Sequence, residues 1–344
     1  MKTDQKAVFV GIDLHNLNWH VTARTLDEEL FSGSIPAGWP QLEKLLNRWR
    51  AIPLRVCYEA GYFGFWLHDQ LRKWGAECLV AAPSLLPKES GNRVKTDRKD
   101  SKKLALFLAK GLLKGVFVPN EEDLAQRQLL RHRRRLIQDR AKIKNRIKAM
   151  FRFHGFELPQ AATWSKSFLA NLKSLNLGNS SLNQVLQSQL RQHDALSEEI
   201  LIMSKQLKEI AQERSEAVKR LTSIPGMGEI SSLELLLEIG PVNRFPEGKK
   251  LAAYVGLTPS QYSSGQHVRM GRIAKTGRPQ LRATLIEVAG ATLRCDAGYR
   301  ALYERFKARM GAKRAITALA RRILLMARAM LVNQVPYSPR LAAS

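Results

Sequence analysis

Alternation of apolar and polar residues is concentrated in the first quarter of this 344-residue chain, and it restricts the possible folds more than any other feature. Residues 7–36 alternate in short β-forming runs separated by turn residues, which predicts a three-strand meander. The pattern then changes repeatedly between the helical and the strand period. We expect, in order, a helix, a strand, a helix and a strand over 41–50, 54–60, 62–74 and 76–82.

Meandering strands followed by alternating helix and strand are the element order of an RNase H-like α/β domain. We place this domain at residues 1–120. The helix expected over 62–74 is amphipathic, and its apolar residues, Trp66 and Trp74 included, are expected to lie in the core.

Helical periodicity dominates after residue 120. One basic helix is predicted over 127–153 and another over 182–221, after a segment rich in Ser, Asn and Gly. The second helix carries a heptad seam, which indicates either antiparallel pairing of the two helices or a contact between subunits; its residues are Leu196, Ile200, Met203, Leu207 and Ile210. We therefore expect a long helical, coiled-coil connector at 121–221 and a mainly α C-terminal domain at 222–344.

The net charge of +26 indicates a polyanionic partner, because a compact protein repels itself at such a charge. Residues 1–120 hold 18 Lys or Arg and 12 Asp or Glu, a net of +6, and the rest holds 38 and 18, a net of +20. Two dense basic stretches, 127–152 and 269–328, favour surfaces that neutralise phosphates. In the first stretch we expect nucleic acid to be bound by Arg131, Arg133, Arg134 and Arg135.

The sequence predicts neither a membrane protein nor an exported one, because it has no long uncharged apolar run and no signal peptide. The three cysteines, Cys57, Cys78 and Cys295, are odd in number and widely spaced. This spacing fits neither a disulfide framework nor a zinc site. We expect reduced core thiols in a cytoplasmic protein.

Four carboxylates follow the predicted elements in an order that suits metal binding. Asp13 ends the first strand, Glu59 ends the fourth, and Asp97 and Asp100 lie one helical turn apart. In an RNase H-like sheet they would converge at one edge, where Mg²⁺ would hold the anions together and assist phosphoryl transfer. Sugar-kinase and actin-type ATPases begin with a similar strand, but the glycine-rich phosphate hairpin that they need is absent after Asp13.

A glycine turn and a serine loop mark the C-terminal part. Pro225-Gly226-Met227-Gly228 resembles a helix–hairpin–helix turn, in which Gly226 and Gly228 would let backbone N–H groups reach a DNA phosphate. A simple turn between packed helices is the alternative.

The serine loop lies in the polar, basic segment 256–282. Ser264, beside Gly265, is a candidate nucleophile, and Ser263 and Tyr262 are alternatives. Cations that would hold a phosphate recur in this segment at steps of three or four residues; they are Arg269, Arg272, Lys275, Arg278 and Arg282.

Together these motifs resemble the DEDD-type transposases of bacterial insertion sequences that use a bridge RNA, and the related pilin-gene DNA invertases. The resemblance covers nearly the whole chain. GID, YEA and KTDRKD supply acids at the positions of the family's RuvC-like domain. SIPGMG, FPEGKKLAAYVGLTPSQYSSG and RMGRIAKTGRPQLR resemble its C-terminal transposase domain, whose Y-x-S-G string aligns Ser264 with the catalytic serine.

The resemblance implies a site-specific DNA recombinase in which Ser264 forms a phosphoseryl link to DNA while the four acids bind Mg²⁺. It further implies double-stranded donor and target DNA, a guide RNA, and homodimers that assemble into a tetramer, with each site completed by two protomers. A cytoplasmic protein that associates with the nucleoid is expected. A metal-only RuvC-like nuclease would need the acids but not Ser264, and an architectural nucleic-acid binder would need neither.

Overall fold

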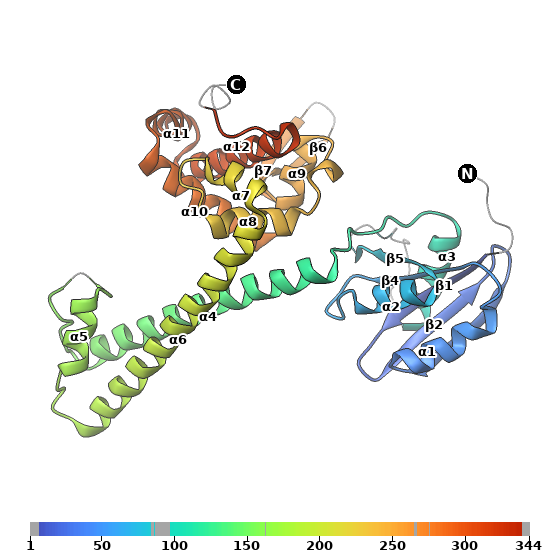
Figure 1. Cartoon of the computed structure of the whole chain (residues 1–344), viewed down its shortest axis with the longest axis horizontal. Helices are drawn as coiled ribbons and strands as arrows, with labels where there is room; N and C mark the ends of the chain where they lie inside the picture. Colours follow the sequence, from blue (N-terminus) through green and yellow to red (C-terminus); the bar gives the residue numbers. More distant parts are fainter. Residues whose placement is uncertain are drawn as a thin grey trace. The chain divides into compact units, whose positions relative to one another are not determined.

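The described part of the chain comprises residues 7–83, 86, 97–161, 163–264, 267–274 and 276–338 of a computed structural model. The chain divides into two units, Met1–Pro119 and Asn120–Ser344, which we call the sheet unit and the helical unit (Figure 1). The segments 121–221 and 222–344 both belong to the helical unit. Because Asn120 is uncharged, the two units carry the net charges of +6 and +20 counted above.

A five-stranded sheet forms the centre of the sheet unit, with the strand order β3-β2-β1-β4-β5. The first three strands pair antiparallel, whereas β4 is parallel to β1 and β5 is parallel to β4. The predicted meander and the alternation that follows it are therefore confirmed. The strands are β1 Val8–Leu14, β2 Asn18–Arg24, β3 Glu29–Pro36, β4 Leu54–Glu59 and β5 Glu77–Ala81.

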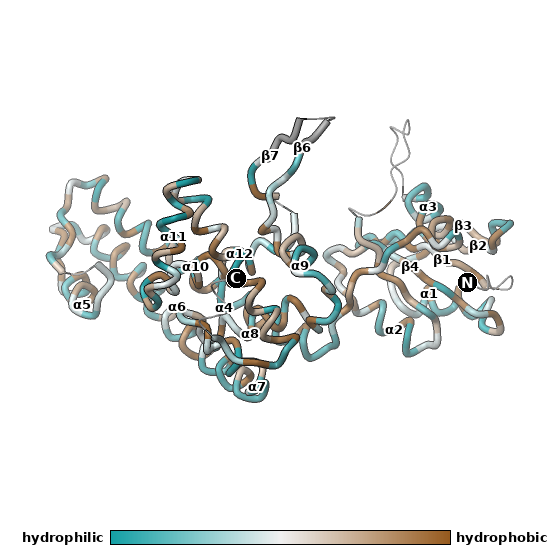
Figure 2. The backbone as a smooth tube through the Cα atoms, turned by 90° about the horizontal axis from the view of Figure 1, so that it is seen from above, coloured by the Kyte–Doolittle hydropathy of each residue, from teal (hydrophilic) through white to brown (hydrophobic). Residues whose placement is uncertain are grey.

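Helices cover both faces of this sheet. On one face, Val10 and Ile12 of β1 pack with α1 (Trp39–Leu46) and α2 (Trp66–Trp74), and a short helical turn, η1, follows at Asn47–Trp49. The apolar strands appear as brown segments in Figure 2. On the other face lies α3, Asp97–Ala109. Successive side chains of a strand point to opposite faces, so Gly11 belongs to the α3 face.

The helix expected over 62–74 is shorter in the structure, because Gly64 adopts a φ of +69° in the turn before α2. Trp66 is 43% exposed, so the prediction that it is a core residue is wrong. Leu67 and Leu71 supply the buried face of the helix instead.

The backbone of α3 approaches β1 very closely at Gly11. A Cβ atom at this position would collide with the carbonyl oxygen of Ser101 and would lie 2.5 Å from the backbone nitrogen of Ala105. Beside this contact the buried hydroxyls of Thr22 and Ser101 are hydrogen-bonded at 2.9 Å. Only glycine allows this approach, which fixes the start of α3 against the central strand.

Two long helices, α4 (Glu121–Phe153) and α6 (Ser180–Glu213), pair antiparallel in the helical unit (Figure 1). The start of α4 packs with the end of α6 through Leu130 and Leu207, and the opposite ends pack through Ile147 and Leu190. The heptad seam therefore packs within the chain. The intervening segment, where no helix was expected, contains α5 (Lys166–Ser174).

The remaining elements of the helical unit enclose a second core. The helix predicted to reach residue 221 is interrupted at Arg214, where α6 gives way to α7. Among the described residues, no helix is long and apolar enough to cross a membrane. The elements are α7 Ser215–Thr222, α8 Glu229–Ile239, η3 Val242–Arg244, α9 Gly248–Val255, β6 Pro259–Ser264, β7 His267–Ile273, α10 Pro279–Cys295, α11 Ala297–Met310 and α12 Ala312–Asn333.

Gly11→Ala will destabilise the sheet unit, because the new methyl group must push α3 away from β1. Overpacking of this kind costs about 1–3 kcal/mol, measurable as a lower urea midpoint. Gly61→Ala is the matched control, since nothing lies within 4 Å of a Cβ at that glycine. Equal stability of the two variants would contradict the close approach.

The cysteines are free, but they are not all core thiols as expected, because Cys295 is exposed. The pKa of Cys57 is raised well above its ordinary value. Burial is the largest cause, followed by the Cys78 thiol and the Glu59 carboxylate. Burial, with a smaller contribution from Asp69, raises the pKa of Cys78 to about 12.

Iodoacetamide at about pH 8 will therefore alkylate Cys295 and spare Cys57 and Cys78, since the thiolate is the reacting form. Peptide mass spectrometry before and after unfolding in urea reads the pattern. Alkylation of Cys57 in the folded protein at the rate of Cys295 would show that the α3 face is open.

Candidate active site

Asp13 and Glu59 lie side by side on adjacent parallel strands. Ile12 pairs with Tyr58 in the β1–β4 register, so the next positions along the two strands are Asp13 and Glu59. Neighbouring strands are about 4.8 Å apart. Alternation assigns both acids to the face of Gly11 and Cys57, which is the face that α3 covers.

Helix α3 carries the other two predicted acids. Asp100 directly precedes Ser101, whose carbonyl oxygen meets Gly11, and it is half-buried. Asp97 is the first residue of α3, and its side chain lies outside the described residues. Two strands and one helix thus carry Asp13, Glu59 and Asp100 at positions on the same face of the sheet.

A hard divalent cation prefers carboxylate oxygens, so the donor chemistry of Asp13 and Glu59 fits such an ion. Within the ranges that the structure describes, no three His, Cys, Asp or Glu side chains are grouped closely enough to hold a metal. The side chains of Asp13, Glu59 and Asp100 are all described, so these three acids do not form such a group, and the side chain of Asp97 lies outside the described residues.

His15 is a neighbour of this site that the sequence did not single out. Its Nε2 lies 3.3 Å from the Oδ2 of Asp13, and the two side chains are 50% and 20% exposed. In the turn after β1, the Oδ1 of Asn16 accepts a hydrogen bond of 2.9 Å from the hydroxyl of Tyr62. The sequence feature that could have predicted this contact is a histidine two residues after an aspartate at the end of a strand.

The serine loop is a β-hairpin in the helical unit. Ser264 is the last residue of β6 and pairs with His267 of β7. The side chains of 262–270 lie outside the described residues, and so do Gly265 and Lys275 altogether. The choice among Tyr262, Ser263 and Ser264 therefore stays a prediction.

The base of this hairpin is locked to the end of α9. Gly256 and Gly277 both have positive φ, +78° and +89°, and a Cβ on Gly277 would lie 2.9 Å from the backbone nitrogen of Gly256. The Nη1 of Arg282 donates to the carbonyl oxygens of Val255 at 3.1 Å and Thr276 at 3.3 Å. Arg282, expected to contact phosphate, thus has partners within the chain.

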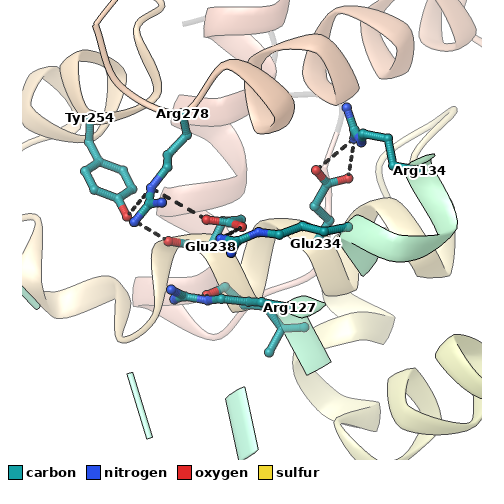
Figure 3. Close-up of polar contacts among 8 residues, drawn as sticks. Arg127, Arg134, Glu234, Glu238, Tyr254 and Arg278 are labelled. Atoms are coloured by element: carbon teal, nitrogen blue, oxygen red, sulfur yellow. Dashed lines mark hydrogen bonds and ion pairs between the residues drawn. The ribbon is translucent and has the colours of Figure 1, made fainter. Parts of the chain in front are cut away.

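Two glutamates of α8 form a buried ion-pair network with arginines from other helices (Figure 3). Glu234, 8% exposed, accepts hydrogen bonds from the Nη2 of Arg134 at 2.9 and 3.0 Å. The hydroxyl of Thr284 on α10 donates to it at 2.8 Å. Burial raises the pKa of Glu234, although Arg134 and Thr284 oppose that shift.

Glu238, one turn later, is 5% exposed and pairs with arginines from two helices. The Nη2 of Arg131 lies 3.3 Å from its Oε1, and the Nε of Arg278 lies 3.6 Å from its Oε2. The same Nε donates to the hydroxyl of Tyr254 at 3.1 Å, and that hydroxyl donates to the backbone oxygen of Glu238 at 3.0 Å. Burial would lower the pKa of Arg278, but Tyr254 and Glu238 raise it.

Arg127 completes the contact between α4 and α8, and it is only 3% exposed. Its Nε and Nη2 both donate to the backbone oxygen of Leu237, the former at 2.8 Å (Figure 3). Burial lowers the pKa of this guanidinium, while Glu238 opposes the shift. The sequence did carry a signal for this network, since two acids one turn apart interrupt the otherwise apolar ELLLEIG.

The other predicted nucleic-acid contacts differ in their surroundings. The Nε of Arg133 donates to the Ser204 hydroxyl at 2.7 Å, whereas Arg135 and Arg272 are exposed. The side chain of Arg269 is outside the described residues.

The glycine turn packs against α10. Gly226 has a φ of +85°, and a Cβ on it would lie 2.5 Å from the backbone nitrogen of Thr292. The Thr292 hydroxyl donates to the Pro225 oxygen at 2.7 Å. Gly228 is the N-cap residue of α8 and has open space where a Cβ would lie. Packing thus accounts for Gly226, and phosphate contact stays a prediction for Gly228.

Comparison with known proteins places both candidate sites in transposase domains. Residues 10–155 match the DEDD transposase model of IS110 elements, and residues 218–304 match the model described as "Transposase IS116/IS110/IS902 family". The first range contains Asp13, Glu59, Asp97 and Asp100, and the second contains Ser264.

Relatives that align over most of the chain agree with this match. The protein y4qE of Sinorhizobium fredii is 28% identical over 83% of this chain and 72% of its own. The transposase for insertion sequence element IS1533 of Leptospira borgpetersenii is 27% identical over 71% and 73%. The transposase for IS1111A of Coxiella burnetii is 27% identical over 71% and 68%.

These matches identify a DNA transposase. The chain belongs to the IS110/IS116 family of transposases.

Arg134→Ala will destabilise the helical unit, because it leaves the Glu234 carboxylate buried without its cation. Breaking a buried pair from one side costs about 3 kcal/mol. The loss will be small near about pH 4 and will grow as pH rises, since a raised carboxyl pKa means that the folded state binds the proton more tightly. Thermal unfolding across this pH range measures it.

Arg135→Ala is the matched control, since the neighbouring arginine is exposed. It should melt like the unmodified protein at every pH. A pH-independent loss in Arg134→Ala would mean that packing, rather than charge, explains the effect.

Proposed function

We propose that this transposase is a site-specific DNA recombinase guided by a structured RNA, which cleaves and rejoins DNA through a phosphoserine intermediate on Ser264. The observation that carries the proposal is the placement of Asp13 and Glu59 at adjacent positions of parallel strands, on the face that α3 covers. Ser264 lies in the second matched domain, beside a basic segment.

We assign the sheet unit to the RNase H-like, RuvC-like class. The order β3-β2-β1-β4-β5, with an antiparallel meander and two parallel strands, supports this assignment. In such a fold the ends of β1 and β4 carry two acids and a later helix carries more. We further propose three functional parts, namely the catalytic domain at 1–120, a helical connector at 121–221 and a transposase domain at 222–344.

A DEDD domain indicates dependence on a divalent metal. We propose Mg²⁺, held by Asp13, Glu59, Asp97 and Asp100. The ion would polarise the DNA phosphate and neutralise charge that develops on its oxygens. His15 beside Asp13 would hold that carboxylate in place.

The serine step exchanges one phosphoester for another. The hydroxyl oxygen of Ser264 bonds to phosphorus while one ester bond of the DNA backbone breaks. The serine proton passes to a base, and the departing DNA oxygen takes up a proton. Attack by a different DNA end reverses these changes and frees the serine, so strands are rejoined without an external energy source.

The charge distribution supports the proposed partners. Most of the positive charge, +20, belongs to the helical unit, where double-stranded donor and target DNA and the guide RNA would be held. Exposed Arg135 and Arg272 are the favoured phosphate contacts, because Arg131, Arg134, Arg278 and Arg282 have partners within the chain.

We also propose homodimers that pair into a tetramer, with the acids of one protomer completing the serine site of another. The buried heptad residues do not form that contact, because they pack inside the chain. Exposed Leu201, 71% accessible on α6, is a better candidate. The proposed location is the cytoplasm, with the protein on nucleoid DNA.

Ser264→Ala will abolish covalent protein–DNA adducts and reduce recombination by at least about 10³-fold, because the attacking oxygen is gone. Guide-RNA binding will be unchanged. Labelled DNA on a denaturing gel reports the adduct, and a mobility-shift assay reports the RNA. Ser263→Ala is the matched control and should form adducts normally.

Asp13→Asn and EDTA will separately test the metal. Both should suppress the adduct if the acids act at the serine step. A metal-only nuclease would instead lose cleavage in Asp13→Asn but still release free DNA ends in Ser264→Ala. Full recombination by Ser264→Ala would refute the serine mechanism.

A further inference from the structure

The end of the α4–α6 hairpin that carries α5 is a folded region with no assigned role. We define it as residues 140–193, and call it the α5 end (Figure 1). It has its own core, in which Ile147 and Phe151 of α4 pack with Phe168 of α5 and Leu186 of α6. This core shares no residue with the core of the sheet unit or with the core that α8 and α10 enclose, so the α5 end is a structural part in its own right.

That surface is strongly basic. Residues 140–193 contain nine Lys or Arg and a single acid, Glu157, a net of +8. Directly outside this range, Asp139 pairs with Lys142 and Asp194 pairs with Lys173. Burial, with Arg140 and Lys148 nearby, lowers the pKa of Lys144, as expected where cations crowd together. The nine cations are Arg140, Lys142, Lys144, Arg146, Lys148, Arg152, Lys166, Lys173 and Arg191.

Aromatic rings lie among these cations. Phe153, the last residue of α4, is 85% exposed and is followed by His154, whose ring centroid lies 5.0 Å from its own. The amino groups of Lys144 and Lys148 lie 5.1 and 5.9 Å from the ring centroid of Trp164. An exposed phenyl face offers a surface on which a nucleic-acid base can stack.

A polar groove adjoins the start of α6. It has a volume of about 680 Å³ and is lined by side-chain amides together with one guanidinium; its residues include Asn176, Asn179, Asn183, Gln187 and Arg191. Several of these amides also bond within the chain, since Asn183 accepts from the backbone N–H of Leu177 and donates to Asn176, and Gln187 donates to the Lys173 oxygen. An amide has two N–H groups and two lone pairs, so the groove still suits sugar hydroxyls and base edges.

We propose that the α5 end binds an unpaired segment of the guide RNA, with a base stacked on Phe153 and phosphates on Arg152 and neighbouring lysines. Stacking requires an exposed base face, which a duplex hides, so this surface suits single-stranded RNA better than double-stranded DNA. The inference rests on the RNA partner proposed above and names the site where part of it binds.

The test measures binding of the full-length protein to two fluorescein-labelled probes by anisotropy. One is a single-stranded RNA of about 16 nucleotides without self-complementarity, and the other is a DNA duplex of the same length. Phe153→Ala should weaken RNA binding about tenfold, the effect of losing one stacked base, and leave duplex binding within twofold. Phe153→Trp keeps an aromatic face at this position and should bind RNA as tightly as the unmodified protein.

Val332→Ala, which removes an exposed apolar side chain from α12, is the matched control and should bind RNA normally. Unchanged RNA affinity in Phe153→Ala would overturn the site, and so would a change of oligomeric state without loss of affinity, which would mark a contact between copies of the chain. Failure of the unmodified protein to bind RNA would overturn the RNA partner as well, while leaving the adduct test of Ser264 unaffected.

Discussion

Burial of two glutamates in an apolar helix governs the architecture of the helical unit. A carboxylate removed from water is costly unless a cation and further hydrogen bonds replace the water. Glu234 and Glu238 obtain these partners from outside α8, namely from Arg131 and Arg134 on α4 and from Arg278 at the start of α10. The long helix and the serine hairpin are therefore both set relative to α8 by the same requirement for charge compensation.

The sheet unit depends on shape rather than charge. Gly11 leaves room for the backbone of α3. This contact fixes where the start of α3 lies relative to the ends of β1 and β4. The acids are thus positioned by a central strand that tolerates no side chain at one point. Rigid support of this kind is what a site that holds several like charges needs, since the charges themselves would push it apart.

The sequence was most informative where a pattern was local. The meander, the parallel strands and the close placement of Asp13 and Glu59 followed from strand periodicity and order. Trp66 was misjudged because Gly64 shortens its helix, and α5 was missed because Ser and Asn residues that cap helices resemble loop residues. The partners of Arg131 and Arg134 lie about a hundred residues away, so a local charge run indicated solvent or nucleic acid where the fold supplies glutamates.

These internal pairs change how the formal charge of the helical unit should be read. A polyanion displaces small ions only where protein cations are open to its phosphates, so each arginine already held by a glutamate or a backbone oxygen contributes little. Arg127, Arg134 and Arg282 belong to this group. The salt dependence of nucleic-acid affinity therefore reflects the exposed cations that contact phosphates, and not the net charge of +20. Salt titration thus measures directly how much of the basic surface contacts phosphates.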